Sequence, residues 1–180
     1  MKYTHENIQS ILNDYNKLVK KVEHQLIKKG KCLYVRGIIL SHNEKYMHIA
    51  YEVVINNHTK TILESVNIKD FNKNDIMRLK KYRAVYDIID KILILAGITT
   101  LNTSTGLLKF YYEPTRKNKF AVILFDIKKS TTSKATLYIP ENWLNYSNEQ
   151  LERAISKYNN IKNYYKQYNE IRSNTHKDIT

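Results

Sequence analysis

The chain has 180 residues, 42% of them hydrophobic, and its 30 Lys and Arg against 17 Asp and Glu leave a net charge of +13. This length suffices for one buried core, so we expect a single domain over residues 1–172 and a flexible tail over residues 173–180. No apolar signal core opens the chain, and Asp90 and Lys91 interrupt the most apolar run, so we expect a cytoplasmic protein without membrane association. The single cysteine excludes an internal disulfide.

The charge surplus has two explanations. Proteins that bind polyanions carry such surpluses because their cations release counterions condensed on phosphates. However, 24 of the 30 basic residues are Lys, and Asn, Ile and Tyr are also abundant. All four are encoded by A/T-rich codons, so genome composition is an alternative cause. The scarcity of Arg favours contact with a nucleic-acid backbone over recognition of base edges.

The first predicted element is an amphipathic helix. Apolar residues recur at three- and four-residue steps from Ile8 to Leu26, and Gly30 follows where a left-handed cap would lie. The opposite face carries five lysines, which either contact phosphates or form an ordinary solvated face. They are Lys17, Lys20, Lys21, Lys28 and Lys29.

Three strands and a second helix are predicted next. The runs from Cys32 to Leu40, Lys45 to Ile55 and Lys60 to Val66 are rich in β-branched and aromatic residues, which predicts an antiparallel meander. A helix is predicted from Asn74 to Gly97. His42, His48 and His58 fall on the meander, but two of them lie in turns at opposite ends of a hairpin, so we expect surface residues and no metal site.

The pattern then repeats. Strands are predicted over residues 107–112, 119–127 and 135–139, with a last helix over residues 147–172. The predicted fold is therefore α+β, in the order αβββαβββα. A shift of 74 positions aligns Leu33 with Leu107 and Asn74 with Asn148. This match indicates two αβββ pseudo-repeats, residues 4–66 and 74–139, whose strands form an antiparallel sheet, or two packed halves, covered by helices. Shared apolar alternation is an alternative cause of the match.

The second meander contains the most basic predicted turn. Arg116, Lys117 and Lys119 lie in it, and Lys128, Lys129 and Lys134 flank the other end of the same hairpin. We expect these side chains to contact phosphates or a protein partner. Aromatic residues interleave with the charges and either stack on bases or alternate into the core. They are Tyr111, Tyr112, Phe120 and Phe125.

The last helix carries a seam with coiled-coil spacing, formed by Leu151, Ala154, Tyr158, Ile161, Tyr165 and Tyr168. This spacing predicts packing on the sheet or on a second copy, which would give a homodimer through the C-terminal helix. A stacking face for nucleic acid is the alternative.

One arrangement indicates catalysis. Glu113 and the segment Asp126-Ile127-Lys128 resemble the acid, then acid-x-Lys, pattern of restriction-endonuclease-like nucleases. The resemblance implies that Glu113 and Asp126 hold a divalent ion while Lys128 stabilises developing negative charge. The chain departs from the pattern because Glu113 precedes its proline, where the family usually has proline followed by aspartate.

These observations favour a non-catalytic protein, without cofactor or metal, that binds nucleic acid or a nucleic-acid-handling complex. One concrete form is an inhibitor encoded by a phage or another mobile element, docking on a host defence nuclease such as a CRISPR effector. That form rests on size, charge and the lack of catalytic signatures. The alternatives are a metal-dependent nuclease and an interaction module that binds an acidic protein surface.

Overall fold

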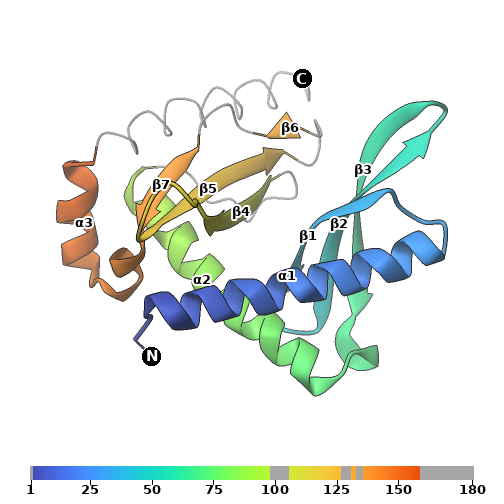
Figure 1. The fold of residues 1–180 in the computed structure, drawn as a ribbon, viewed down its shortest axis with the longest axis horizontal. Helices are drawn as coiled ribbons and strands as arrows, with labels where there is room; N and C mark the ends of the chain where they lie inside the picture. Colours follow the sequence, from blue (N-terminus) through green and yellow to red (C-terminus); the bar gives the residue numbers. More distant parts are fainter. Residues whose placement is uncertain (1, 98–105, 127–130, 133–135, 159–180) are drawn as a thin grey trace. The chain divides into compact units, whose positions relative to one another are not determined.

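A computed structural model describes residues 2–97, 106–126, 131–132 and 136–158 (Figure 1). The fold is α+β, which confirms the predicted class. In chain order the elements are α1 (His5–Lys28), β1 (Tyr34–Leu40), β2 (Tyr46–Ile55), β3 (His58–Asn67), the 3₁₀ helix η1 (Ile68–Asp70), α2 (Lys73–Leu95), β4 (Gly106–Tyr112), β5 (Lys119–Asp126), β6 (Thr131–Thr132), β7 (Leu137–Pro140), the 3₁₀ helix η2 (Glu141–Asn145) and α3 (Asn148–Ser156).

The strands form two antiparallel sheets. Sheet A has the order β1-β2-β3. In sheet B, β5 is central, β4 pairs with one edge of it, and β6 and β7 pair with successive parts of the other edge. The third position of sheet B is therefore filled by two short strands, whereas the sequence predicts one. In both sheets the second strand of the meander is central.

The two halves of the chain repeat the same local order. Each meander leads through a 3₁₀ helix into an α-helix: η1 precedes α2, and η2 precedes α3. A shift of 74 residues carries the start of β2 at Tyr46 to Phe120, one residue inside β5. It also carries the start of α2 at Lys73 to Ser147, one residue before α3. The element order supports a structural repeat, while its bounds at residues 4–66 and 74–139 stay a prediction.

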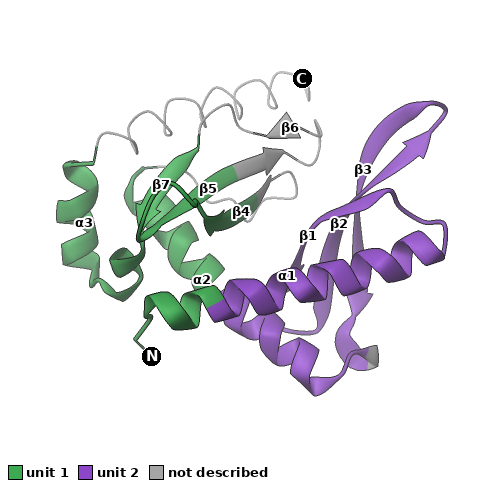
Figure 2. Cartoon of the chain, viewed as in Figure 1, with its two compact units in different colours: residues 1–9, 85–180 green, residues 10–84 purple. Residues whose placement is uncertain are grey.

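The chain divides into two compact units, residues 10–84 and residues 1–9 with 85–180 (Figure 2). Helices α1 and α2 each contribute residues to both units. The boundary of a single domain at residue 172 stays a prediction, as does the tail beyond it, because both lie outside the described residues.

Within residues 10–84, α1 and α2 pack against sheet A. Three directly opposed pairs of β1 and β2 are buried and share one face of the sheet: Val35 and Tyr51, Ile38 and Ile49, and Leu40 and Met47. On the helices, the rings of Tyr15 and Tyr82 stack at 3.4 Å between centroids and 4° between planes. The apolar face of α1 is thus held in the core, and its lysines lie on the opposite side.

Side chains from both helices satisfy the outer edge of β1. The buried Tyr15 hydroxyl accepts the Ile38 N–H at 3.0 Å and donates to the Ile38 carbonyl at 2.7 Å. A Glu23 carboxylate oxygen accepts the Val35 N–H at 2.9 Å, and Arg83 donates to the Leu40 carbonyl at 2.8 Å. These side chains bond backbone groups of β1 that a fourth strand would otherwise bond, so this edge is closed to another chain.

Turn chemistry explains where the elements of this unit stop. Gly30 has φ of 68°, and the amides of Gly30 and Lys31 bond back to the carbonyls of Ile27 and Leu26, which ends α1 as the sequence predicts. Asn56 and Asn57, with φ of 52° and 65°, form the two-residue turn between β2 and β3. Asn tolerates this left-handed backbone better than most residues do.

The unit formed by residues 1–9 and 85–180 has its own core. Phe110 and Phe120 meet edge to face at 6.4 Å between ring centroids, and Phe120 also stacks on Tyr112 at 4.7 Å. Trp143 of η2 is buried and meets the Tyr158 ring at 5.2 Å. The N-terminal segment docks on η2 within this unit, because the Asn145 side chain bonds both the N–H and the carbonyl of Tyr3.

The last described helix, α3, covers the first part of the predicted range. Ser147 caps α3 in a capping box with Gln150, and α3 ends at Ser156, where the Lys157 amide bonds back to the carbonyls of Ala154 and Ile155. Residues 159–172 lie outside the described part of the chain, so the predicted helix there stays a prediction. None of the described helices is long and apolar enough to cross a membrane.

Candidate nucleic-acid interface

Helix α1 carries a row of basic side chains on its exposed face. Lys17, Lys20, Lys21, His24 and Lys28 follow each other at three- and four-residue steps, so they lie along one side of the helix. All five are exposed. From Lys17 to Lys28 the row extends about 17 Å at the rise of an α-helix. We call Lys17, Lys20, His24 and Lys28 the α1 row.

Lys21 differs from its neighbours because it has a structural partner. Its Nζ lies 2.7 Å from an oxygen of Asp75, whose side chain is only 3% exposed, and Arg78 lies 3.2 Å from the other oxygen. Since Asp75 is buried, its charge needs these cations. Lys21 therefore joins α1 to α2, and we leave it out of the α1 row although the sequence places it on the same face.

The remaining lysines of the row have no such partner. Lys17, Lys20 and Lys28 make no ion pair with any residue that the structure describes. Over residues 10–84 the chain has fifteen Lys or Arg and seven Asp or Glu. Several of these acids are bound elsewhere: Glu23 at the edge of β1, Glu44 to Lys80, and Glu52 to Arg36. Among the described residues, these three lysines therefore have no ion-pair partner that would neutralise their charge.

The second candidate surface is the turn between β4 and β5. Arg116 lies over the Tyr138 ring at 3.8 Å from its centroid, and Lys119 lies 5.7 Å from the Tyr158 centroid. Lys117 is exposed. The rings orient two of the three predicted cations without removing their charge. Lys128, Lys129 and Lys134, predicted at the far end of this hairpin, lie outside the described residues.

The aromatic residues of this hairpin divide between core and surface. Phe120 is fully buried, and Tyr112 stacks on it and donates to Glu141 at 3.1 Å. Burial and the neighbouring Glu141 carboxylate raise the pKa of Tyr112. Tyr111 is exposed. Phe120 thus lies in the core, and the half-buried Tyr112 has its ring between Phe120 and His5, so neither offers a free face for base stacking. The Phe125 side chain lies outside the described part of the chain.

The predicted nuclease residues do not come together in the described structure. Tyr112 pairs with Phe120 at one end of the β4–β5 pair, next to Glu113, whereas Asp126 pairs with Gly106 at the other end. About six residue steps of roughly 3.4 Å separate the two ends, which is too far for Glu113 and Asp126 to share an ion. Glu113 instead accepts from the Thr115 hydroxyl at 3.3 Å. Lys128 lies outside the described residues.

The predicted seam is only partly described. Leu151 is buried within its unit, and Tyr158 packs against Trp143. Ile161, Tyr165 and Tyr168 lie outside the described residues, so dimerisation through this segment stays a prediction.

The predicted surface histidines have local partners. His42 bonds with Arg83 at 2.9 Å, and His48 bonds with Ser65 at 2.7 Å. Burial, Arg83 and His42 lower the pKa of His48. The described residues contain no group of three or more His, Cys, Asp or Glu that could hold a metal ion.

These features define an α+β protein of two antiparallel sheets with a cationic helix face. No protein-family model, curated protein or solved structure matches the chain.

Proposed function

We propose that this chain binds nucleic acid through the α1 row, by contact with the phosphate backbone and without catalysis. The observation that carries the proposal is that Lys17, Lys20 and Lys28 line one exposed helix face without an ion pair to a described residue. Lysine contacts of this kind release counterions and carry no sequence information. The packing of Tyr15 and Tyr82 holds the opposite face of α1, so the row is presented on a fixed element.

The test compares two variants with the same change in charge. Lys17→Glu/Lys20→Glu/Lys28→Glu reverses the row, and Lys45→Glu/Lys69→Glu/Lys73→Glu reverses three exposed lysines of the same unit that lie outside it. Affinity for a labelled DNA is measured across a salt series. We expect the row variant to lose affinity at least about tenfold more than the control, with a salt slope lower by up to about three.

Two outcomes would contradict the proposal. Equal losses in both variants would show that affinity follows net charge and that the row has no special role. Polyglutamate binding as tight as DNA binding would favour an acidic protein surface as the partner.

The narrower prediction of an inhibitor from a mobile element has its own test. If the chain competes for the surfaces of a host nuclease that hold guide or target strands, the wild-type protein should inhibit a purified CRISPR effector. The row variant should not inhibit it, because the lysines that compete with those strands are reversed.

A further inference from the structure

The hairpin of β2 and β3 extends past the end of β1. The last paired residue of β1 is Tyr34, opposite Glu52, and the Leu33 N–H bonds to the Glu52 carbonyl at 2.8 Å. Beyond Glu52, the residues of β2 pair only with β3, which leaves a two-stranded ribbon over residues 53–60 (Figure 1). Three further residues of β2 at about 3.4 Å each project the ribbon about 10 Å past β1.

The side chains at the end of this ribbon do not contribute to the buried core. Every residue from Val54 to Lys60 is exposed, and Val54 and Ile55 have exposed fractions of 54% and 46%. A two-stranded ribbon gains little stability by itself. Apolar side chains that are exposed on a projecting element indicate a surface that contacts another molecule. The amides of Asn56 and Asn57, together with His58, form its polar tip.

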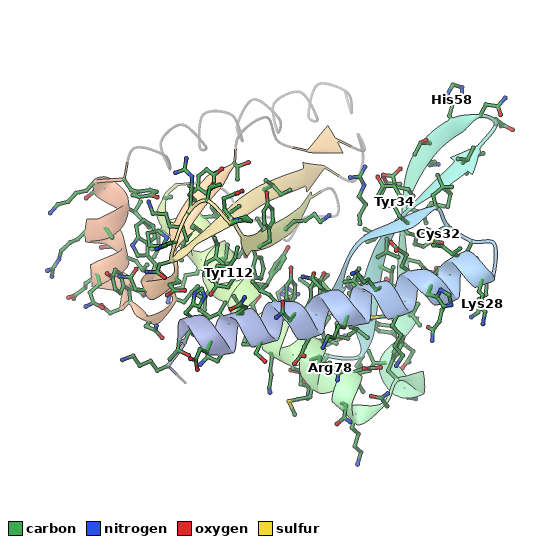
Figure 3. All side chains as sticks on the ribbon, in the orientation of Figure 1. Lys28, Cys32, Tyr34, His58, Arg78 and Tyr112 are labelled. Atoms are coloured by element: carbon green, nitrogen blue, oxygen red, sulfur yellow. The ribbon has the colours of Figure 1, made fainter. Side chains whose placement is uncertain are left out.

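The surroundings of the ribbon are positively charged. Residues 24–43 and 53–63 contain no Asp or Glu. Lys28 and Lys29 at the end of α1, Lys31 before β1, and Lys60 in the ribbon are all exposed. Lys28, Cys32, Tyr34 and His58 lie at the same end of this unit (Figure 3). A partner that contacts the ribbon would therefore also contact the lysines beside it, and this positive charge complements a polyanion.

We propose that the ribbon enters the major groove of B-form DNA while the flanking lysines contact the phosphates. This inference rests on the proposed function and specifies that the nucleic acid is duplex DNA in the B form. The major groove is about 12 Å wide and 8.5 Å deep and admits a two-stranded ribbon. Two strands about 4.8 Å apart with a projection of about 10 Å fit these dimensions. The major groove of A-form RNA is too narrow for such an element.

Asn, Thr and apolar side chains are suited to this groove. Asn can bond the adenine edge in two places, and apolar groups contact the thymine methyl. The tip supplies the first through Asn56 and Asn57, and β2 supplies the second through Val54 and Ile55, one on each face of the ribbon. A single strand exposes the same base edges but has no groove to hold the ribbon against them, so the ribbon should favour duplex DNA over a single strand.

The experiment uses the full chain and the variant Asn56→Gly/Asn57→Gly/His58→Ala. Gly adopts the left-handed backbone of the turn, and no Lys or Arg is lost. The matched control is Gln9→Ala/Asn74→Ala/Asn148→Ala, which removes three exposed neutral side chains from helices. Affinities for a 20-base-pair DNA duplex, its single strand and the equivalent RNA duplex are measured across the same salt series.

We expect the wild-type protein and the control to bind duplex DNA more tightly than both other ligands. The ribbon variant should lose at least about fivefold of its preference for duplex over single-stranded DNA, with its salt slope unchanged. Wild-type protein should also protect guanine N7, which lies in the major groove, from dimethyl sulfate, and the ribbon variant should not.

Binding by the wild-type protein without a duplex preference would overturn the groove inference and leave the proposed function standing. The same holds if the ribbon variant keeps both the preference and the N7 protection, or if duplex RNA binds as tightly as duplex DNA. Absence of binding to every nucleic acid near 0.1 M salt would instead overturn the proposed function, and the groove inference with it.

Discussion

Tyr15 shows how a single side chain can complete a sheet. Its hydroxyl bonds both the N–H and the carbonyl of Ile38, at the edge of β1 that no strand covers in the described structure. Removing the hydroxyl leaves two backbone groups in the core without these bonds. We expect Tyr15→Phe to lower the free energy of unfolding by about 1–3 kcal/mol, measured by urea denaturation. Tyr46→Phe, at an exposed position, should cost less than about 0.5 kcal/mol, and equal losses would contradict this role.

The same hydroxyl makes stability dependent on pH in the alkaline range. Burial raises the pKa of Tyr15 to about 12, above its ordinary value of 10.0. The folded state holds this proton more tightly than the unfolded state does. The contribution of the hydroxyl to the free energy of unfolding is therefore complete below pH 10 and is lost as pH rises to about 12. We expect the wild-type protein to lose more unfolding free energy than Tyr15→Phe between pH 9 and 11. This comparison cancels the shared titration of the lysines, and parallel losses would be the contrary result.

At the scale of the element, α3 depends on its N-cap. The Ser147 hydroxyl accepts the Gln150 N–H, and the Gln150 side chain bonds the Ser147 N–H in return. We expect Ser147→Ala to lower stability by about 1 kcal/mol and Ser147→Asp to retain most of it, because a carboxylate also accepts from the first turn. Unfolding followed by the fluorescence of Trp143 would measure both. A full loss in Ser147→Asp would show that the cap is not responsible.

The elements were predicted well where their pattern is local. Apolar spacing located α1 and α2, and β-branched runs located the first five strands within about two residues. Gly30 marked a real cap, and the predicted start of the last helix at residue 147 coincides with the N-cap of α3. Non-local features escaped prediction. The short strand β6 and the 3₁₀ helix η2 have no periodic pattern of their own, and α3 ends at Ser156 although the apolar seam continues along the sequence.

In the candidate site, too, local features were predicted from the sequence and non-local contacts were not. Helical spacing alone placed Lys17, Lys20 and Lys28 on one exposed face. It could not show that Lys21 binds Asp75, which is 54 positions away in the chain. The wrong nuclease arrangement has a related cause. The resemblance to a nuclease pattern implied that Glu113 and Asp126 meet, but the antiparallel register of β4 and β5 places them at opposite ends. The β2–β3 ribbon went unnoticed because its projection depends on where β1 stops.

At the scale of the whole molecule, α1 and α2 run through both compact units. We therefore expect one cooperative unfolding transition, as the prediction of a single domain requires. The only tryptophan, Trp143, reports on the unit that contains sheet B, and far-ultraviolet circular dichroism reports on all helices. Coincident urea curves from the two signals would support this expectation. Two separate midpoints would show that residues 10–84 and the other unit unfold independently.

The central claim is that the α1 row contacts phosphates. Its most direct test is the affinity of the wild-type protein for a labelled DNA duplex across a salt series, in Mg²⁺ and in EDTA. We expect intact DNA in both. The logarithm of the affinity should fall linearly with the logarithm of salt concentration, with a slope of about −3 or steeper, one phosphate for each of Lys17, Lys20 and Lys28. Negligible affinity near 0.1 M salt, or an affinity insensitive to salt, would contradict the claim.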